Sequence, residues 1–79
     1  MWTIIGASYC NWCHKAEDLL YEKDPENFVN IYEIDNKESK WLRFFLKKAG
    51  MSTVPQIFDP DGNHIGGYED LEDYFKKAA

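Results

Sequence analysis

The chain has 79 residues, 44% of them hydrophobic and 16% aromatic, a length and composition that favour one compact domain spanning 1–79. Its net charge of −5 argues against nucleic acid or an anionic membrane surface as a partner. No apolar run reaches the roughly 18 residues of a membrane span, and the N-terminus lacks the basic flank of a secretory signal, so we expect a soluble, cytoplasmic protein.

The first half of the chain predicts a strand, a helix and a second strand. Trp2–Gly6 is an apolar run typical of a strand, and residues 11 to about 23 have helical periodicity that ends at Asp24-Pro25, a turn signal. Residues 28–34 carry apolar and aromatic side chains on both alternating faces. This pattern is typical of a strand covered on both sides, and we expect it in the middle of the sheet.

The second half predicts a helix, a hairpin and a last helix. Asp35-Asn36 offers an N-cap for the first of these, and Gly50 its end. Gln56–Phe58 and His64–Gly66 flank a turn rich in proline and glycine, and residues 69–78 form a helix with acidic residues first and lysines last. The order strand, helix, strand, helix, strand, strand, helix predicts an α/β fold: a four-stranded mixed sheet with helices on both faces.

Two cysteines, Cys10 and Cys13, stand at the junction of the first strand and the first helix, and the chain has no others. Unpaired N–H groups and the positive end of the helix dipole favour a thiolate at Cys10. Cys13 lies one helical turn further on and can reach Cys10 to form an intramolecular disulfide. We therefore expect a catalytic dithiol; the alternative is an incidental pair.

Zinc is the rival chemistry, with Cys10, Cys13, His14 and His64 as nominal ligands. His14 follows Cys13 directly on the predicted helix, so it points about 100° away from it. No second CxxC or HxxxH supplies the usual ligand spacing. We expect no metal site, and a surface or edge-strand position for each histidine.

Three separated motifs resemble those of small dithiol glutaredoxins, a family with the thioredoxin-like fold. They are CNWC at 10–13, TVPQIF at 53–58, where the family has a cis-proline, and GGYEDL at 66–71, where it has two glycines and an acidic pair. The resemblance covers essentially the whole chain. It implies a glutathione-dependent thiol–disulfide oxidoreductase with Cys10 as the more exposed nucleophile, Cys13 as the resolving thiol, no bound cofactor and glutathione as the reductant.

The resemblance also implies a glutathione site. Val54, turned toward the dithiol by a cis bond to Pro55, would bind the cysteinyl portion like an added strand, and Glu69 and Asp70 would hold the γ-glutamyl end. A plain proline turn and ordinary helix capping are the alternatives. The implied glutathione-binding residues are Trp12, Thr53, Val54, Pro55, Gly67, Tyr68, Glu69 and Asp70.

One position departs from the family pattern. Many glutaredoxins have a lysine three residues before the first cysteine, and this chain has Ala7 there. The glycine carboxylate of glutathione would then meet Lys37, Lys40 or Arg43, unless these side chains form a solvated helix face.

The implied protein partners are oxidised disulfides, with ribonucleotide reductase as a family-level candidate, and we expect a monomer. One alternative is an iron–sulfur cluster carrier, in which two chains each give Cys10 and two glutathiones complete the coordination. Against it, Asn11-Trp12 differs from the Gly-Phe pair of dedicated carriers. Another alternative is a redoxin that takes its electrons from thioredoxin reductase.

Overall fold

The computed structural model describes residues 1–78, and its helices and strands follow the predicted order. Most bounds agree with the expected ones within a residue; the start of the second helix does not. The elements are β1 (Trp2–Gly6), α1 (Asn11–Lys23), β2 (Val29–Glu33), α2 (Leu42–Lys48), β3 (Gln56–Phe58), β4 (His64–Gly66) and α3 (Tyr68–Ala78).

The strands form one mixed sheet in the order β2-β1-β3-β4. β1 pairs with β2 in parallel, with Trp2 opposite Val29 and Gly6 opposite Glu33. β3 runs antiparallel to both β1 and β4. The predicted four-stranded mixed sheet is therefore confirmed, and β1 and β3 occupy its centre.

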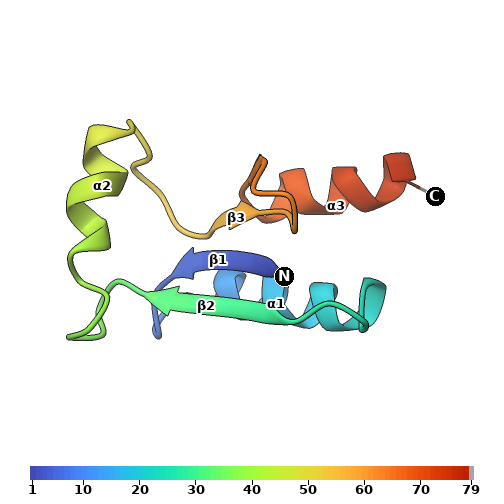
Figure 1. Cartoon of the computed structure of the whole chain (residues 1–79), viewed down its shortest axis with the longest axis horizontal. Coiled ribbons are helices and arrows are strands. Elements are labelled where there is room, and N and C mark those ends of the chain that lie inside the picture. Colours follow the sequence, from blue (N-terminus) through green and yellow to red (C-terminus); the bar gives the residue numbers. More distant parts are fainter. Residues whose placement is uncertain (79) are drawn as a thin grey trace.

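The expectation that residues 28–34 form a central strand was wrong, because β2 is an edge strand (Figure 1). Its side chains remain partly open: Ile31 is 37% exposed and Tyr32 is 41% exposed. Apolar residues on both faces of a strand indicate what covers those faces, and they carry no information about which strand pairs beside it. The sequence pattern therefore could not place β2 within the sheet.

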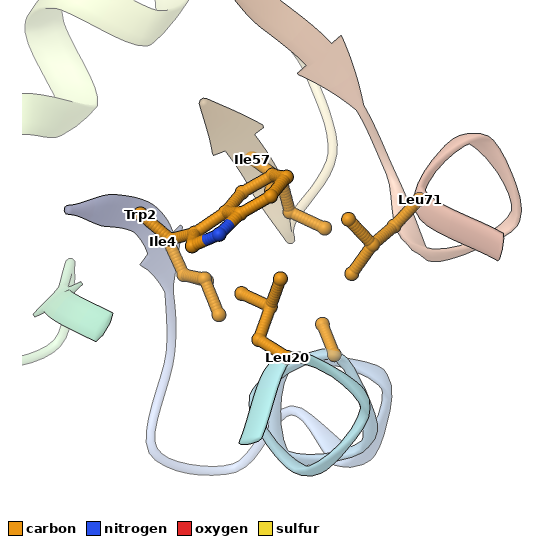
Figure 2. Close-up of a cluster of buried hydrophobic side chains, with 6 residues drawn as sticks. Trp2, Ile4, Leu20, Ile57 and Leu71 are labelled. Atoms are coloured by element: carbon orange, nitrogen blue, oxygen red, sulfur yellow. The ribbon is translucent and has the colours of Figure 1, made fainter. Parts of the chain in front are cut away.

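The core lies on the face of the sheet that α1 and α3 cover together. Trp2 and Ile4 point from β1 toward Leu20 of α1, and Ile57 of β3 and Leu71 of α3 close the cluster (Figure 2). Burial alternates along β1, so its even-numbered residues face this core. The cluster packs α1, through Ala16 and Leu20, against β1 and so holds the helix that begins at the cysteines in place.

α2 stands beyond the ends toward which β1 and β2 run (Figure 1). Only its start approaches the second face of the sheet, where Trp41 and Leu42 line a hollow together with Ile5. The predicted cap at Asp35-Asn36 was wrong, because these residues lie in turns and α2 begins at Leu42 without a side-chain cap. No helix within residues 1–78 is long and apolar enough to cross a membrane.

The Asp35 and Asn36 side chains have other partners. The backbone N–H of Ser8 donates to Asp35 Oδ1 over 2.9 Å, and the backbone N–H of Glu38 donates to Asn36 Oδ1 over 3.0 Å. Both acceptors are therefore engaged before the chain reaches the helix.

We expect Leu20→Ala to lower the free energy of unfolding by about 2–5 kcal/mol, because it empties a fully buried site between sheet and helices. Urea unfolding followed by circular dichroism measures this loss. Phe44→Ala is the control, since Phe44 is 63% exposed on α2 and its truncation should change stability little. Equal losses in the two variants would contradict the assigned core.

Asp24 is the C-cap of α1, and its side chain ties the end of the helix to the first strand. Asp24 Oδ2 accepts hydrogen bonds from Trp2 Nε1 and from Asn27 Nδ2, each over 2.9 Å. The bond from Trp2, followed by that from Asn27, lowers the pKa of Asp24 below its usual value.

The pKa of Asp24 in the native protein lies below the unfolded-state value of about 3.9. The Asp24 carboxylate therefore stabilises the fold at pH values above about 3.9, and this stabilisation is lost as the pH falls through the native-state pKa. We expect Asp24→Asn to be less stable than the parent at neutral pH and the gap to shrink near pH ~2. Denaturant unfolding at both pH values checks this. Asp18→Asn, on the exposed side of α1, is the control. A stability difference between Asp24→Asn and the parent that stays constant with pH would contradict the role assigned to Asp24.

Candidate active site

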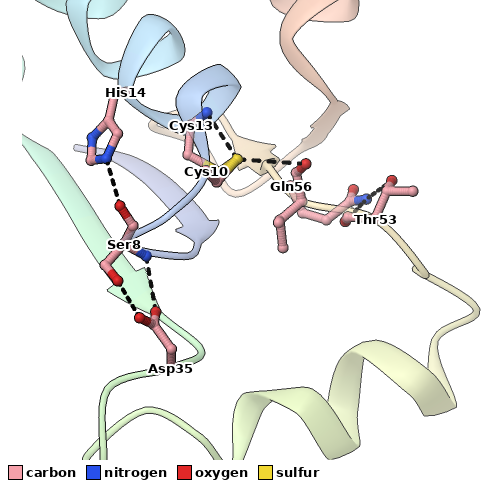
Figure 3. Close-up of a disulfide and its surroundings, with 8 residues drawn as sticks. Ser8, Cys10, Cys13, His14, Asp35, Thr53 and Gln56 are labelled. Atoms are coloured by element: carbon pink, nitrogen blue, oxygen red, sulfur yellow. Dashed lines mark hydrogen bonds between the residues drawn. A yellow bond between two sulfur atoms is a disulfide. The ribbon is translucent and has the colours of Figure 1, made fainter.

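Cys10 and Cys13 occupy the junction of β1 and α1 and are joined by a disulfide, with their Cα atoms 5.2 Å apart (Figure 3). Cys10 is the N-cap of α1, and its Sγ accepts a hydrogen bond from the backbone N–H of Cys13 over 3.1 Å. Cys10 is half-buried, whereas Cys13 is only 5% exposed. Cys10 is therefore the sulfur that a substrate can approach.

The end of β1 leaves room for Cys13 because Gly6 has no side chain. A Cβ at Gly6 would lie 2.9 Å from Cys13 Sγ, closer than real Cβ atoms come to a sulfur. Ala7, also small and buried, follows it. These two residues let the helix begin directly against the sheet.

The same geometry favours a thiolate once the disulfide is reduced. A sulfur at the N-cap position takes the place of the usual oxygen acceptor and receives an N–H that the helix cannot otherwise use. The positive end of the helix dipole adds to this. Since the thiolate is the form of cysteine that takes part in thiol–disulfide exchange, these contacts favour reactivity at Cys10.

The Val54–Pro55 bond is cis, as the resemblance implied. It places the carbonyl oxygen of Val54 3.9 Å from Cys10 Sγ. The buried side chain of Gln56 supports this segment: its Nε2 donates to the Thr53 carbonyl over 2.8 Å, and its Oε1 accepts from His64 Nε2 over 2.7 Å. Sequence reasoning missed Gln56, because nothing in the pattern marks an amide that joins the cis-proline segment to β4.

One groove of about 260 Å³ lies beside the dithiol, between the start of α1, the cis-proline segment and the start of α3. Trp12 and Tyr68 form one wall, with their ring centroids 5.2 Å apart, and the Lys15 ammonium lies 4.4 Å from the Trp12 ring. The groove is lined by the eight residues that the resemblance implied for glutathione binding: Trp12, Thr53, Val54, Pro55, Gly67, Tyr68, Glu69 and Asp70.

Asp70 also caps α3. Its Oδ2 accepts from the backbone N–H of Gly67 over 2.9 Å, which is the reach-back typical of a helix N-terminus. Gly66, with a φ of 121°, lies against the same carboxylate, and a Cβ there would collide with it. Capping, which was open for both Glu69 and Asp70, therefore falls to Asp70, and the exposed carboxylate of Glu69 lines the groove.

A second hollow of about 430 Å³ shares Thr53 and Val54 with the groove and extends toward α2. Arg43 lines it, next to Tyr9, and its Nε donates to the Ile34 carbonyl over 3.1 Å. Two of the three expected cations, Lys37 and Lys40, lie instead on the exposed turns before α2.

A chain of hydrogen bonds fixes the loop that leads into Cys10. The backbone N–H and the hydroxyl of Ser8 both donate to the Asp35 carboxylate, and His14 Nε2 donates to the Ser8 carbonyl over 2.9 Å (Figure 3). The bonds from Ser8 lower the pKa of Asp35. His14 is thus committed to the loop, and among residues 1–78 no three His, Cys, Asp or Glu side chains are grouped to hold a metal.

Comparisons with known proteins agree with this geometry. The glutaredoxin family model matches residues 1–65. The glutaredoxin of Enterobacteria phage T4 is 39% identical over 74 residues, which cover 85% of each chain.

Solved structures give the same result. The solution structure of a dithiolic glutaredoxin from Trypanosoma brucei brucei is 32% identical and has a TM-score of 0.82, over 98% of this chain and 78% of that one. A buckwheat glutaredoxin, crystallised as its glutathione complex, shares the fold with a TM-score of 0.79 at 20% identity, over 98% of this chain and 69% of the other. The chain therefore belongs to the glutaredoxin family of thiol–disulfide oxidoreductases, and it carries the family's CxxC pair as Cys10 and Cys13.

Proposed function

We propose that this glutaredoxin reduces protein disulfides and glutathione mixed disulfides with glutathione as its reductant and no bound cofactor. The observation that carries the proposal is the groove beside Cys10, whose lining includes all eight residues expected to bind glutathione. A tripeptide thiol bound there would present its sulfur to the more exposed cysteine. Glutathione is in this sense a substrate.

The reaction follows from the different positions of the Cys10 and Cys13 sulfur atoms. The Cys10 thiolate attacks a disulfide and forms a mixed disulfide, while the first half of the substrate leaves as a thiolate. Cys13 then attacks Cys10, which gives the Cys10–Cys13 disulfide and releases the second half. Two glutathione molecules return the pair to the dithiol and leave as glutathione disulfide, so two electrons pass from glutathione to the substrate.

The groove fits the parts of glutathione in order. The Val54 backbone beside Cys10 suits the cysteinyl residue, and the Trp12 and Tyr68 rings offer an apolar wall. The start of α3, with the carboxylates of Glu69 and Asp70, suits the γ-glutamyl ammonium and carboxylate. The buckwheat glutaredoxin, which shares the fold, was crystallised with glutathione, and this supports glutathione as the ligand.

Arg43 is our candidate for the glycine carboxylate, because it lines the hollow that continues the groove past Val54. A guanidinium can pair with a carboxylate through two hydrogen bonds. This contact would replace the lysine that the chain lacks at Ala7.

We further propose that residues 1–79 form a single glutaredoxin domain that works as a monomer in the cytoplasm. The groove and both cysteines come from one chain, and a glutathione-reduced dithiol needs a reducing compartment. Oxidised protein disulfides are the proposed partners, with ribonucleotide reductase as a candidate.

We expect Cys10→Ser to lower turnover of a glutathione mixed disulfide at least ~100-fold, because Cys10 is the more exposed sulfur and lies next to Val54 of the groove, whereas Cys13 is buried. Cys13→Ser should keep much of this activity and lose reduction of protein disulfides. The hydroxyethyl-disulfide assay with glutathione and its reductase measures the first reaction. Turnover that survives Cys10→Ser would contradict the assignment of Cys10 as the nucleophile. If the parent protein is active only with thioredoxin reductase, thioredoxin reductase and not glutathione is the electron donor.

We expect Asp70→Asn to raise the KM for glutathione about 5–30-fold, because the amide can still cap α3 but no longer pairs with an ammonium. Asp73→Asn is the matched control on the same helix, since Asp73 is exposed and lies outside the groove. Amide shifts on titration with glutathione should cluster at Trp12, Val54 and Asp70. Unchanged shifts at these three residues would refute the proposed site.

A further inference from the structure

A separate hollow lies behind the resolving cysteine, on the side of β1 that faces β2. It has a volume of about 150 Å³, enough for several water molecules. The glutathione groove lies on the β3 side and shares none of its lining with this hollow. The lining residues are Ala7, Cys13, His14, Glu17, Ile31 and Glu33.

Two glutamates, Glu17 and Glu33, line the hollow because of where the chain places them. Glu17 follows Cys13 by four residues on α1, so the two side chains lie on the same face of the helix. Glu33 is opposite Gly6 in the parallel pair of β1 and β2, so it shares the face of the sheet against which Cys13 packs. Both glutamates are half-buried.

The chemistry of the second step requires a proton acceptor at this place. Cys13 is a nucleophile only as a thiolate, yet it is 5% exposed, and burial disfavours the charged sulfur. Unlike Cys10, it does not occupy the N-cap position of α1. Its proton must therefore leave as the sulfur attacks, and the hollow is a path that reaches Cys13.

We propose that Glu17 and Glu33 accept the proton of the Cys13 thiol, through water in the hollow, during the resolving step. The Cys13 sulfur bonds to Cys10 Sγ, the bond between Cys10 and the substrate sulfur breaks, and the substrate leaves as a thiolate with the electron pair. The cysteines are oxidised, the substrate sulfur is reduced, and the proton passes to a carboxylate. In the reverse direction, the same carboxylates return a proton to Cys13.

Two other titratable groups lie nearby. His14 lines the hollow, and because its Nε2 donates to the Ser8 carbonyl, the neutral ring keeps only Nδ1 as an acceptor. Tyr21 lies next to Glu17; partial desolvation, together with the charge of Glu17, raises its pKa, so its hydroxyl stays protonated at neutral pH. The test therefore includes His14→Gln.

Removing the carboxylates distinguishes proton transfer from a simple effect of charge. A nearby negative charge opposes formation of the Cys13 thiolate, so if charge alone mattered, neutral variants would resolve faster. If the carboxylates accept the proton, the same variants resolve more slowly. The two explanations predict opposite signs.

The experiment mixes reduced protein with an aromatic disulfide, a dithiobis-nitrobenzoate, that releases a coloured thiolate, and it needs no glutathione. The first release, dependent on reagent concentration, reports attack by Cys10; the second, independent of concentration, reports attack by Cys13. Both phases are measured across pH for Glu17→Gln, Glu33→Gln, the double variant and His14→Gln. Glu22→Gln, on the exposed side of α1, is the matched control.

We expect the double variant to slow the second phase at least ~10-fold at neutral pH and to leave the first phase within about 2-fold. The rate of the second phase should approach that of the parent in alkaline solution, where hydroxide removes the proton. An unchanged or faster second phase would overturn the proposal. Slowing of the second phase by the same factor at every pH would also overturn it, because this indicates that the substitutions displace Cys13. Slowing in His14→Gln alone would assign the role to the imidazole instead. None of these outcomes bears on glutathione binding.

Discussion

The hydrogen bond from the Cys13 backbone N–H to Cys10 Sγ is the interaction on which the rest of the site depends. It makes Cys10 the cap of α1, so one sulfur both completes the helix and lies next to the Val54 carbonyl. The small Gly6 lets Cys13 pack against the strand behind it. Local helix chemistry and sheet packing thus give the two cysteines different exposure and different surroundings.

The two sulfurs face different parts of the molecule. Cys10 lies next to the cis-proline segment, where the groove can take an extended peptide, and Cys13 borders a small hollow with two carboxylates. Substitutions in the groove and in the hollow should therefore affect the proposed substrate binding and the proposed proton transfer from Cys13 separately. The order of the strands accounts for this separation, since β3 lies on one side of β1 and β2 on the other.

Much of this arrangement could be predicted from the sequence. Helical and alternating patterns gave the order of the elements, and three short motifs identified the residues that meet in the groove. The edge position of β2 and the late start of α2 were missed, because they depend on strand pairing and on the partners that Ser8 and Glu38 provide for Asp35 and Asn36. Gln56 was missed because its side-chain hydrogen bonds to Thr53 and His64 depend on how the chain folds, and the sequence pattern does not show them.

The most direct test of the N-cap interaction is the pH titration of the thiolate absorbance of reduced Cys13→Ser, which retains the donating N–H and a single thiol. In the folded protein we expect the midpoint at least one pH unit below the value of about 8.5 for an ordinary cysteine, and a return to that value in denaturant. A folded-state midpoint at or above about 8.5 would contradict the role assigned to the start of α1.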